Sequence, residues 1–360
     1  MRRLKNLVTV MRQTYQIPAV AVAVTVPGQG CWASATGPEN TGSGAPLTLA
    51  DQFPIGSITK TFTATVILQL VQQGKLSLSA PVSRWVPYVQ HASAITVKML
   101  LNMTSGIYDE PGGQLLKDSV AHPGTAWTPQ QVVRFAAGQG PAGPPGKFYY
   151  SDTNYIILGM IAQAVTGEPI QKLISQRILQ PLHLTHTSFP TAAAPPRLPV
   201  QGYTVEGKSA FPTSFFESPA ELSFSGAAGA MISTVADLHV WARALATGTL
   251  LSPSMQRQRL QLAPMPLPAF PPLPGTGVAA GLPPGYGLGL YSLGGWLGHK
   301  GAVTGYNADM FYLPAKNATI IVLVNARSPR FLLSTGEDVG DAAAISIAQI
   351  AVPGAQATPG

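Results

Sequence analysis

The sequence is poor in charged residues. Asp, Glu, Lys and Arg make up only 10% of its 360 residues, against about a quarter in an average protein, and the net charge is +7. The basic residues are scattered, and the one cluster, Met1–Lys5, is more typical of a solvated chain end than of a nucleic-acid surface. We therefore expect no nucleic-acid partner.

Cysteine is almost absent. The single residue Cys31 excludes an intrachain disulfide and leaves the redox compartment open. Cys31 begins a β-type stretch that continues to Thr36, so a buried structural thiol is favoured over a nucleophile.

Long apolar runs are also missing. No segment reaches the roughly 18 continuous apolar residues of a membrane helix, so we expect no integral membrane segment. The basic start resembles the beginning of a signal peptide, but Leu7–Met11 is too short for its apolar region. The location stays open: periplasmic or secreted if a leader has been removed, and otherwise cytoplasmic.

What the chain does contain is 46% hydrophobic residues in two kinds of pattern. Apolar β-branched runs bounded by turn residues predict strands near both ends, at 19–26, 31–36, 286–293, 299–303, 308–313 and 319–325. Apolar residues at three- and four-residue spacing predict helices at 4–16, 57–73, 97–101, 129–137, 154–165, 170–179, 235–245 and 340–350. This order predicts an α+β fold, in which residues 1–78 and 230–360 form a sheet lobe and residues 79–229 an inserted, mostly helical lobe.

One tetrapeptide, Ser57-Ile58-Thr59-Lys60, places a hydroxyl and an amine one helical turn apart, on the same face. An amine in this position can turn a weak alcohol into an acylating nucleophile without a histidine. A chain of this length contains roughly one Ser-x-x-Lys by chance, and this is the only one here.

Three further segments follow the tetrapeptide: Leu100–Gly106, Tyr150-Ser151-Asp152 and His299-Lys300-Gly301. With Ser57-x-x-Lys60 they resemble, in order and separation, the motifs of the serine β-lactamase and penicillin-binding protein superfamily. The match is to the branch of class C β-lactamases, D-Ala-D-Ala carboxypeptidases and related esterases. The resemblance implies a β-lactamase/transpeptidase-like fold, with a three-layer α/β/α lobe and the active site in the cleft between the lobes.

The resemblance also implies roles for individual residues. Ser57 would be the nucleophile, and the backbone N–H groups of Ser57 and Ala302 would form the oxyanion hole. Lys60 and Tyr150 would carry the proton. Because neither works at its free pKa of about 10, we expect a cationic Lys60 to lower the pKa of Tyr150. His299 would stabilise the site and the anionic end of the substrate, and Asp152, Lys300 and Gly301 would support substrate binding.

Two residues depart from the family pattern. Asp152 stands where Asn is usual, and an ionised Asp can only accept hydrogen bonds. It would keep Lys60 protonated and so favour Tyr150 as the base. Lys300 stands where Thr or Ser is common. It either reaches a substrate carboxylate, or pairs with Asp152 or points to solvent, and the second interpretation is favoured.

The sequence therefore predicts a serine hydrolase that forms an acyl-enzyme and cleaves an ester, an amide or a small D-amino-acid peptide. The alternatives are a penicillin-binding sensor that releases its acyl group slowly, or an acyltransferase. The departures disfavour efficient β-lactam hydrolysis, although β-lactams remain candidate inhibitors. His183 and His186 have weak metal-like spacing, but a structural role is favoured, so no metal or cofactor is expected.

Overall fold

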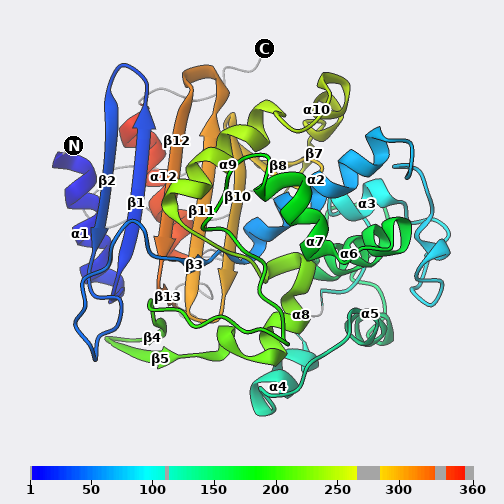
Figure 1. The fold of residues 1–360 in the computed structure, drawn as a ribbon, viewed down its shortest axis with the longest axis horizontal. Coiled ribbons are helices and arrows are strands. Elements are labelled where there is room, and N and C mark those ends of the chain that lie inside the picture. The colour runs from blue at the N-terminus through cyan, green and yellow to red at the C-terminus, as the bar shows by residue number, and fades with distance from the viewer. Residues whose placement is uncertain (1, 110–112, 266–283, 329–337, 353–360) are drawn as a thin grey trace.

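The computed structural model describes residues 2–109, 113–265, 284–328 and 338–352. Its centre is an eight-stranded antiparallel sheet with the order β2-β1-β12-β11-β10-β9-β8-β7 (Figure 1). Strands from both ends of the chain are therefore neighbours, which confirms the α+β prediction. The strands are β1 (Val20–Val26), β2 (Gly30–Thr36), β7 (Ala263–Pro264), β8 (Pro284–Tyr286), β9 (Tyr291–Leu293), β10 (Trp296–Val303), β11 (Tyr306–Leu313) and β12 (Ala318–Val324).

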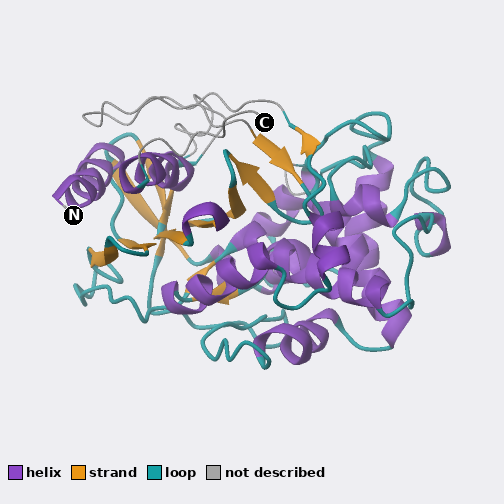
Figure 2. Ribbon diagram, turned by 90° about the horizontal axis from the view of Figure 1, so that it is seen from above, coloured by secondary structure: helices purple, strands orange, loops and turns teal. Residues whose placement is uncertain are grey.

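Helices cover both faces of this sheet (Figure 2). α1 (Arg2–Tyr15) and α12 (Val339–Ala351) pack together on one face, and α9 (Val235–Thr247) packs on the other. Because both faces are covered, the central strands are buried along almost their whole length. In β12, for example, the sequence ATIIVLV is buried at every position. The three-layer arrangement expected from the resemblance is thus present.

The middle of the chain forms the helical part. α2 (Thr59–Gln72) lies at its centre and is buried on nearly all sides, with Phe62 stacked on Trp241 at a centroid distance of 4.3 Å. Around it pack α6 (Asp152–Thr166) and α8 (Pro219–Gly229). The other helices here are α3 (Val97–Leu101), α4 (Gln114–Ala121), α5 (Pro129–Gly138), α7 (Ile170–Ile174) and α10 (Pro253–Arg259).

Short strands form two further, smaller sheets. β3 (Phe53–Pro54) pairs with β6 (Ile232–Ser233), while β4 (Gly202–Glu206) lies between β5 (Ser209–Thr213) and β13 (Ala326–Arg327). The division of the chain at 78/79 and 229/230 stays a prediction. In the ranges that the structure describes, no helix is both long and apolar enough to span a bilayer.

Two local expectations are wrong. The strand expected at 286–293 is two strands, β8 and β9, because the chain turns at Gly287–Leu290, where the N–H of Gly287 donates to the carbonyl of Leu290. Cys31 is exposed rather than buried, since β2 is the edge strand of the sheet.

Candidate active site

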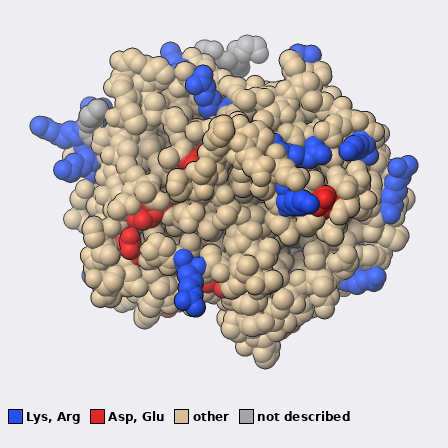
Figure 3. All heavy atoms as spheres, in the orientation of Figure 1, with Lys and Arg blue, Asp and Glu red and all other residues tan. Residues whose placement is uncertain are grey.

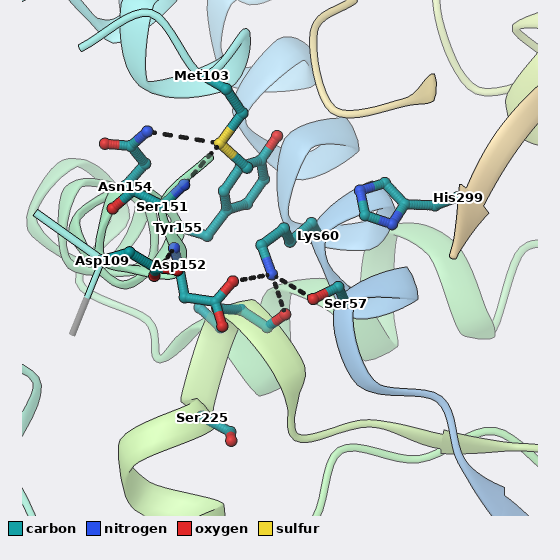
Figure 4. Close-up of polar contacts among 12 residues, drawn as sticks. Ser57, Lys60, Met103, Asp109, Ser151, Asp152, Asn154, Tyr155, Ser225 and His299 are labelled. Atoms are coloured by element: carbon teal, nitrogen blue, oxygen red, sulfur yellow. Dashed lines mark hydrogen bonds and ion pairs between the residues drawn. The ribbon is translucent and has the colours of Figure 1, made fainter. Parts of the chain in front are cut away.

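Ser57 and Lys60 lie at the start of the central helix. Ser57 is in the 3₁₀ turn η1 (Gly56–Ile58), which leads directly into α2, and Lys60 is fully buried in the first turn of α2. Lys60 Nζ lies 2.7 Å from Ser57 Oγ, 2.9 Å from the carbonyl oxygen of Ala228 in α8, and 2.5 Å from Asp152 Oδ1 in α6 (Figure 4). Three acceptors thus surround the amine, which suits the three N–H bonds of an ammonium group.

Two opposing effects act on the pKa of Lys60. Burial lowers it, because an ammonium group without water is destabilised, while the charges of Asp152 and Asp109 raise it. Burial is the larger effect, so the pKa of Lys60 lies below that of a free lysine. Asp152 does raise the pKa of Lys60, as expected, but this effect is smaller than that of burial.

Tyr150 precedes α6 and lies beside Ser57. Its ring stacks on Tyr291 and meets Tyr286 edge-on, and Lys60 Nζ lies 5.1 Å from its centroid. Burial raises the pKa of Tyr150 well above its ordinary value, and Tyr291 and Asp152 raise it further, whereas a hydrogen bond with Ser57 lowers it. The expected lowering of this pKa is wrong, because burial and nearby carboxylates dominate. Tyr150 is therefore a neutral phenol at neutral pH.

The N-terminus of α6 is fixed by the loop after α3. Asp109 Oδ1 accepts a 2.8 Å hydrogen bond from the backbone N–H of Asp152, and Ser151 Oγ donates to the carbonyl of Tyr108. Two residues after Asp152, Asn154 Oδ1 accepts a hydrogen bond from Ser105 Oγ at 2.6 Å. These bonds hold the Tyr150-Ser151-Asp152 segment against Lys60 (Figure 4). The sequence analysis did not identify Asp109. Its position three residues after Gly106, which ends the Leu100–Gly106 segment, could have pointed to it.

Strand β10 lies directly against the nucleophile turn. Gly301 approaches so closely that a Cβ atom there would lie 2.0 Å from the carbonyl oxygen of Ile55 and 2.8 Å from the N of Ser57. In the same way, a Cβ at Gly56 would lie 2.7 Å from the N of Ala302. Both glycines are thus required by close backbone approach. The two backbone nitrogens expected to form an oxyanion hole, those of Ser57 and Ala302, lie at this contact.

His299 is near the site but fully buried (Figure 4). Its Nε2 lies 3.0 Å from the hydroxyl of Tyr286, and Nδ1 contacts the carbonyl of Lys300. Burial lowers the pKa of His299 well below its usual range, and the charge of Lys60 adds to this. His299 is therefore a neutral ring inside an aromatic cluster rather than a cation presented to a substrate.

Lys300 has a partner that sequence reasoning did not consider. Its Nζ lies 3.0 Å from Asp341 Oδ2 in α12, on the face of the sheet opposite α9. Asp152 pairs with Lys60 instead. The proposed pairing of Lys300 with Asp152 is thus replaced by an ion pair with α12.

Glu221, in the first turn of α8, is a second acidic residue that the sequence did not reveal. Its side chain is buried, and Ser225 Oγ donates to Oε1 at 2.8 Å. Burial raises its pKa to about 7, while the hydrogen bond from Ser225 and the charge of Arg327 lower it and the charge of Asp152 raises it. Nothing in the local sequence distinguishes Glu221 from a solvent-facing residue at a helix start.

On the face in Figure 3, Lys and Arg lie mainly toward the edges, and most of the surface is uncharged. Within the described residues, no three His, Cys, Asp or Glu side chains are arranged to hold a metal ion. His186 follows α7, and its backbone N–H donates to Asp237.

Comparisons with known proteins agree with this geometry. The D-amino acid amidase of Ochrobactrum anthropi SV3, solved with D-phenylalanine, superposes with a TM-score of 0.78 at 25% identity, over 96% of this chain and 98% of that one. A D-stereospecific amidohydrolase from Streptomyces sp. gives a TM-score of 0.71 at 29% identity, over 89% and 94% of the two chains.

Among curated proteins, the putative penicillin-binding protein PbpX of Bacillus subtilis (strain 168) is 29% identical over 283 residues. The matched region is 79% of this chain but only 63% of the Bacillus protein. The model of the family described as Beta-lactamase matches residues 4–344, which include all the motif segments named above. This chain therefore belongs to the Beta-lactamase family.

Proposed function

We propose that the protein is a serine hydrolase that forms an acyl-enzyme at Ser57 and acts on amides or esters of small D-amino acids. The 2.7 Å contact between Lys60 Nζ and Ser57 Oγ carries this proposal, because it joins an alcohol to an amine whose pKa is lowered by burial. The choice of substrate is supported by the similarity to D-amino acid amidase and D-stereospecific amidohydrolase.

In the acylation step, Ser57 Oγ attacks the substrate carbonyl carbon while its proton passes to neutral Lys60. The carbonyl oxygen, now negative, accepts hydrogen bonds from the N–H groups of Ser57 and Ala302. Tyr150, a neutral phenol, donates its proton to the leaving amine or alkoxide as the carbon–nitrogen or carbon–oxygen bond breaks. The ammonium group of Lys60 then returns a proton to Tyr150, so both carriers are restored.

In the second step, water attacks the acyl-enzyme. Its proton passes to neutral Lys60, the resulting ammonium group protonates Ser57 Oγ as the carbon–oxygen bond of the acyl-enzyme breaks, and the free acid is released. This scheme assigns the base to Lys60 and the acid to Tyr150, as the directions of their pKa shifts favour.

A second candidate is a β-lactam-binding protein that is acylated but turns over slowly. The ion pair of Lys60 with Asp152 favours it, because the carboxylate raises the pKa of the lysine and so reduces the free base available in the second step. Persistent labelling by a fluorescent penicillin, without nitrocefin hydrolysis, would support this candidate.

The decisive test is a substrate panel measured on the wild type and Ser57→Ala. The panel contains p-nitrophenyl acetate, the amides of D- and L-phenylalanine, a D-alanyl-D-alanine peptide and nitrocefin. We expect turnover of the ester and the D-amide, and loss of both in Ser57→Ala. Ser34→Ala, on the edge strand β2, is the matched control. Undiminished turnover in Ser57→Ala would contradict the proposal.

A further inference from the structure

Asn307, a buried polar residue of β11, forms a hydrogen bond to strand β10 and has no role in the mechanism above. Asn307, in β11, is 2% exposed, and its Nδ2 donates a 3.0 Å hydrogen bond to the carbonyl oxygen of Gly301. Asn307 and Ala302 are direct cross-strand partners, so the side chain of Asn307 reaches over to the neighbouring residue of β10.

The bonded carbonyl belongs to the peptide unit that supplies the second oxyanion donor. In a trans peptide, the C=O of Gly301 and the N–H of Ala302 lie in one plane and point in opposite directions. The N of Ala302 faces Gly56 and the nucleophile turn, while the O of Gly301 faces Asn307. A bond that fixes the carbonyl therefore also fixes the direction of the N–H, and it polarises the N–H into a better donor.

The surroundings of Asn307 leave it little freedom to rotate. A Cβ on Gly340, in the first turn of α12, would overlap Asn307 Oδ1, so helix and side chain are in direct contact. Asn307 Oδ1 is buried without a hydrogen-bond partner in the described structure. Keeping such an atom unpaired costs stability, which an apolar residue at the same position would avoid. A structural role alone therefore does not explain the amide.

We infer that Asn307 is a positioning residue for the oxyanion hole, which holds the Gly301–Ala302 peptide so that the Ala302 N–H points at the substrate carbonyl. This inference rests on the proposed function. It links the C-terminal helix α12 to the reaction, because α12 packs on the amide that orients the donor.

The test compares Asn307→Leu, Asn307→Asp and a matched buried amide, Asn325→Leu. Asn325 is also fully buried and bonds only to backbone, accepting from Ala19 N and donating to the carbonyl of Gln201. Removing an oxyanion donor outright costs about 10²–10³-fold in kcat, so we expect Asn307→Leu to lose roughly 10-fold or more. KM should change little, while binding of a boronic acid, whose tetrahedral adduct occupies the oxyanion hole, should weaken in parallel with kcat.

Asn307→Asp gives an independent readout. An ionised carboxylate cannot donate to Gly301, but a protonated one can. The charged groups around this position are Asp309 on β11, Asp338 and Asp341 at the start of α12, Lys300 on β10 and Arg327 on β13. Burial and Asp341 already raise the pKa of Asp309 well above its ordinary range, so an acid at 307 should also protonate readily. The activity of Asn307→Asp, divided by that of the wild type, should rise as the pH falls.

Rates are divided by the number of sites that a serine-directed phosphonate labels at completion, so unfolded protein does not count. The inference is overturned if Asn307→Leu keeps kcat within about twofold of Asn325→Leu, or if the Asn307→Asp ratio is flat with pH. Failure of the proposed function would differ: the wild type would then show no phosphonate labelling, or Ser57→Ala would remain active.

Discussion

Lys60 Nζ and Asp152 Oδ1 lie 2.5 Å apart, and the lysine side chain is fully buried while that of the aspartate is 21% exposed. The pair therefore joins a buried amine to a carboxylate that solvent still reaches. The opposing effects of burial and of the Asp152 charge set the pKa of Lys60, and that pKa decides what fraction of the lysine is a neutral base at a given pH.

Asp152→Asn should move the acid limb of the pH profile to lower pH. The carboxylate raises the pKa of Lys60, so its removal lowers that pKa and frees the neutral amine at lower pH. The measurement is kcat/KM for p-nitrophenyl acetate, which is uncharged, between pH 5 and 10. Glu168→Gln, which breaks the exposed Glu168–Lys172 pair, is the control and should leave the limb in place. If the acid limb of Asp152→Asn stays at the same pH or moves to higher pH, Lys60 is not the base.

Tyr150→Phe should affect amides more than activated esters. A neutral phenol protonates the leaving amine, whereas p-nitrophenolate leaves without a proton. We expect a loss on the order of 10²-fold in kcat for the D-phenylalanine amide and a clearly smaller loss for p-nitrophenyl acetate. Tyr149→Phe, at the neighbouring position, serves as the control and should retain activity with both. Equal losses for both substrates in Tyr150→Phe would argue against a role as acid.

Gly301→Ala should abolish most activity. The new Cβ would meet the carbonyl of Ile55 and the N of Ser57, so β10 and the nucleophile turn must move apart. A misplacement of about 1 Å at a reacting group costs on the order of 10²-fold in rate. The measurement is kcat/KM together with the melting temperature. Gly124→Ala is the control, since a Cβ there meets open space. Near-normal activity of Gly301→Ala would show that this contact does not shape the site.

Glu221→Gln should flatten the dependence of stability on pH. The folded-state pKa of Glu221 is about 7 against 4.5 for a free group, so the folded protein holds this proton more tightly than the unfolded chain. Its contribution to stability therefore declines as pH rises from about 4.5 to about 7, by up to about 3 kcal/mol. Thermal unfolding at pH 5 and pH 8 measures this decline. It should be smaller in Glu221→Gln, and unchanged in the exposed control Glu206→Gln. Identical pH slopes in wild type and Glu221→Gln would refute the assignment.

Much of this site follows from short-range sequence signals. Ser57 and Lys60 come together through a single helical turn, which their spacing in the sequence predicts. The order of the motifs identifies Tyr150, Asp152 and Gly301 as further site residues. Local periodicity likewise predicts most helices and the strands at both ends. Such signals depend on neighbours along the chain, which a sequence displays directly.

What sequence reasoning missed depends on partners distant in the chain. Lys300 meets Asp341 because α12 packs on β11 and β12, next to β10. Cys31 is exposed because β2 is the edge strand of the sheet that the described residues form. The pKa direction of Tyr150 was wrong for the same reason. It depends on how deeply Tyr286 and Tyr291 bury the ring, and these residues come from strands more than a hundred residues away.

The pairing of the first strand with the last long one also sets a condition on biosynthesis. Val20 in β1 pairs with Val324 in β12, about 300 residues later, and β11 and β12 lie between β10 and β1 in the sheet. Contacts of such long range form slowly, because the intervening chain must first be brought together. Until β11 and β12 have been synthesised and have paired, β10 is not held in the sheet against the nucleophile turn. A chain truncated before β12 should therefore carry Ser57 and Lys60 without being able to acylate, because the site is complete only when β10, β11 and β12 have paired.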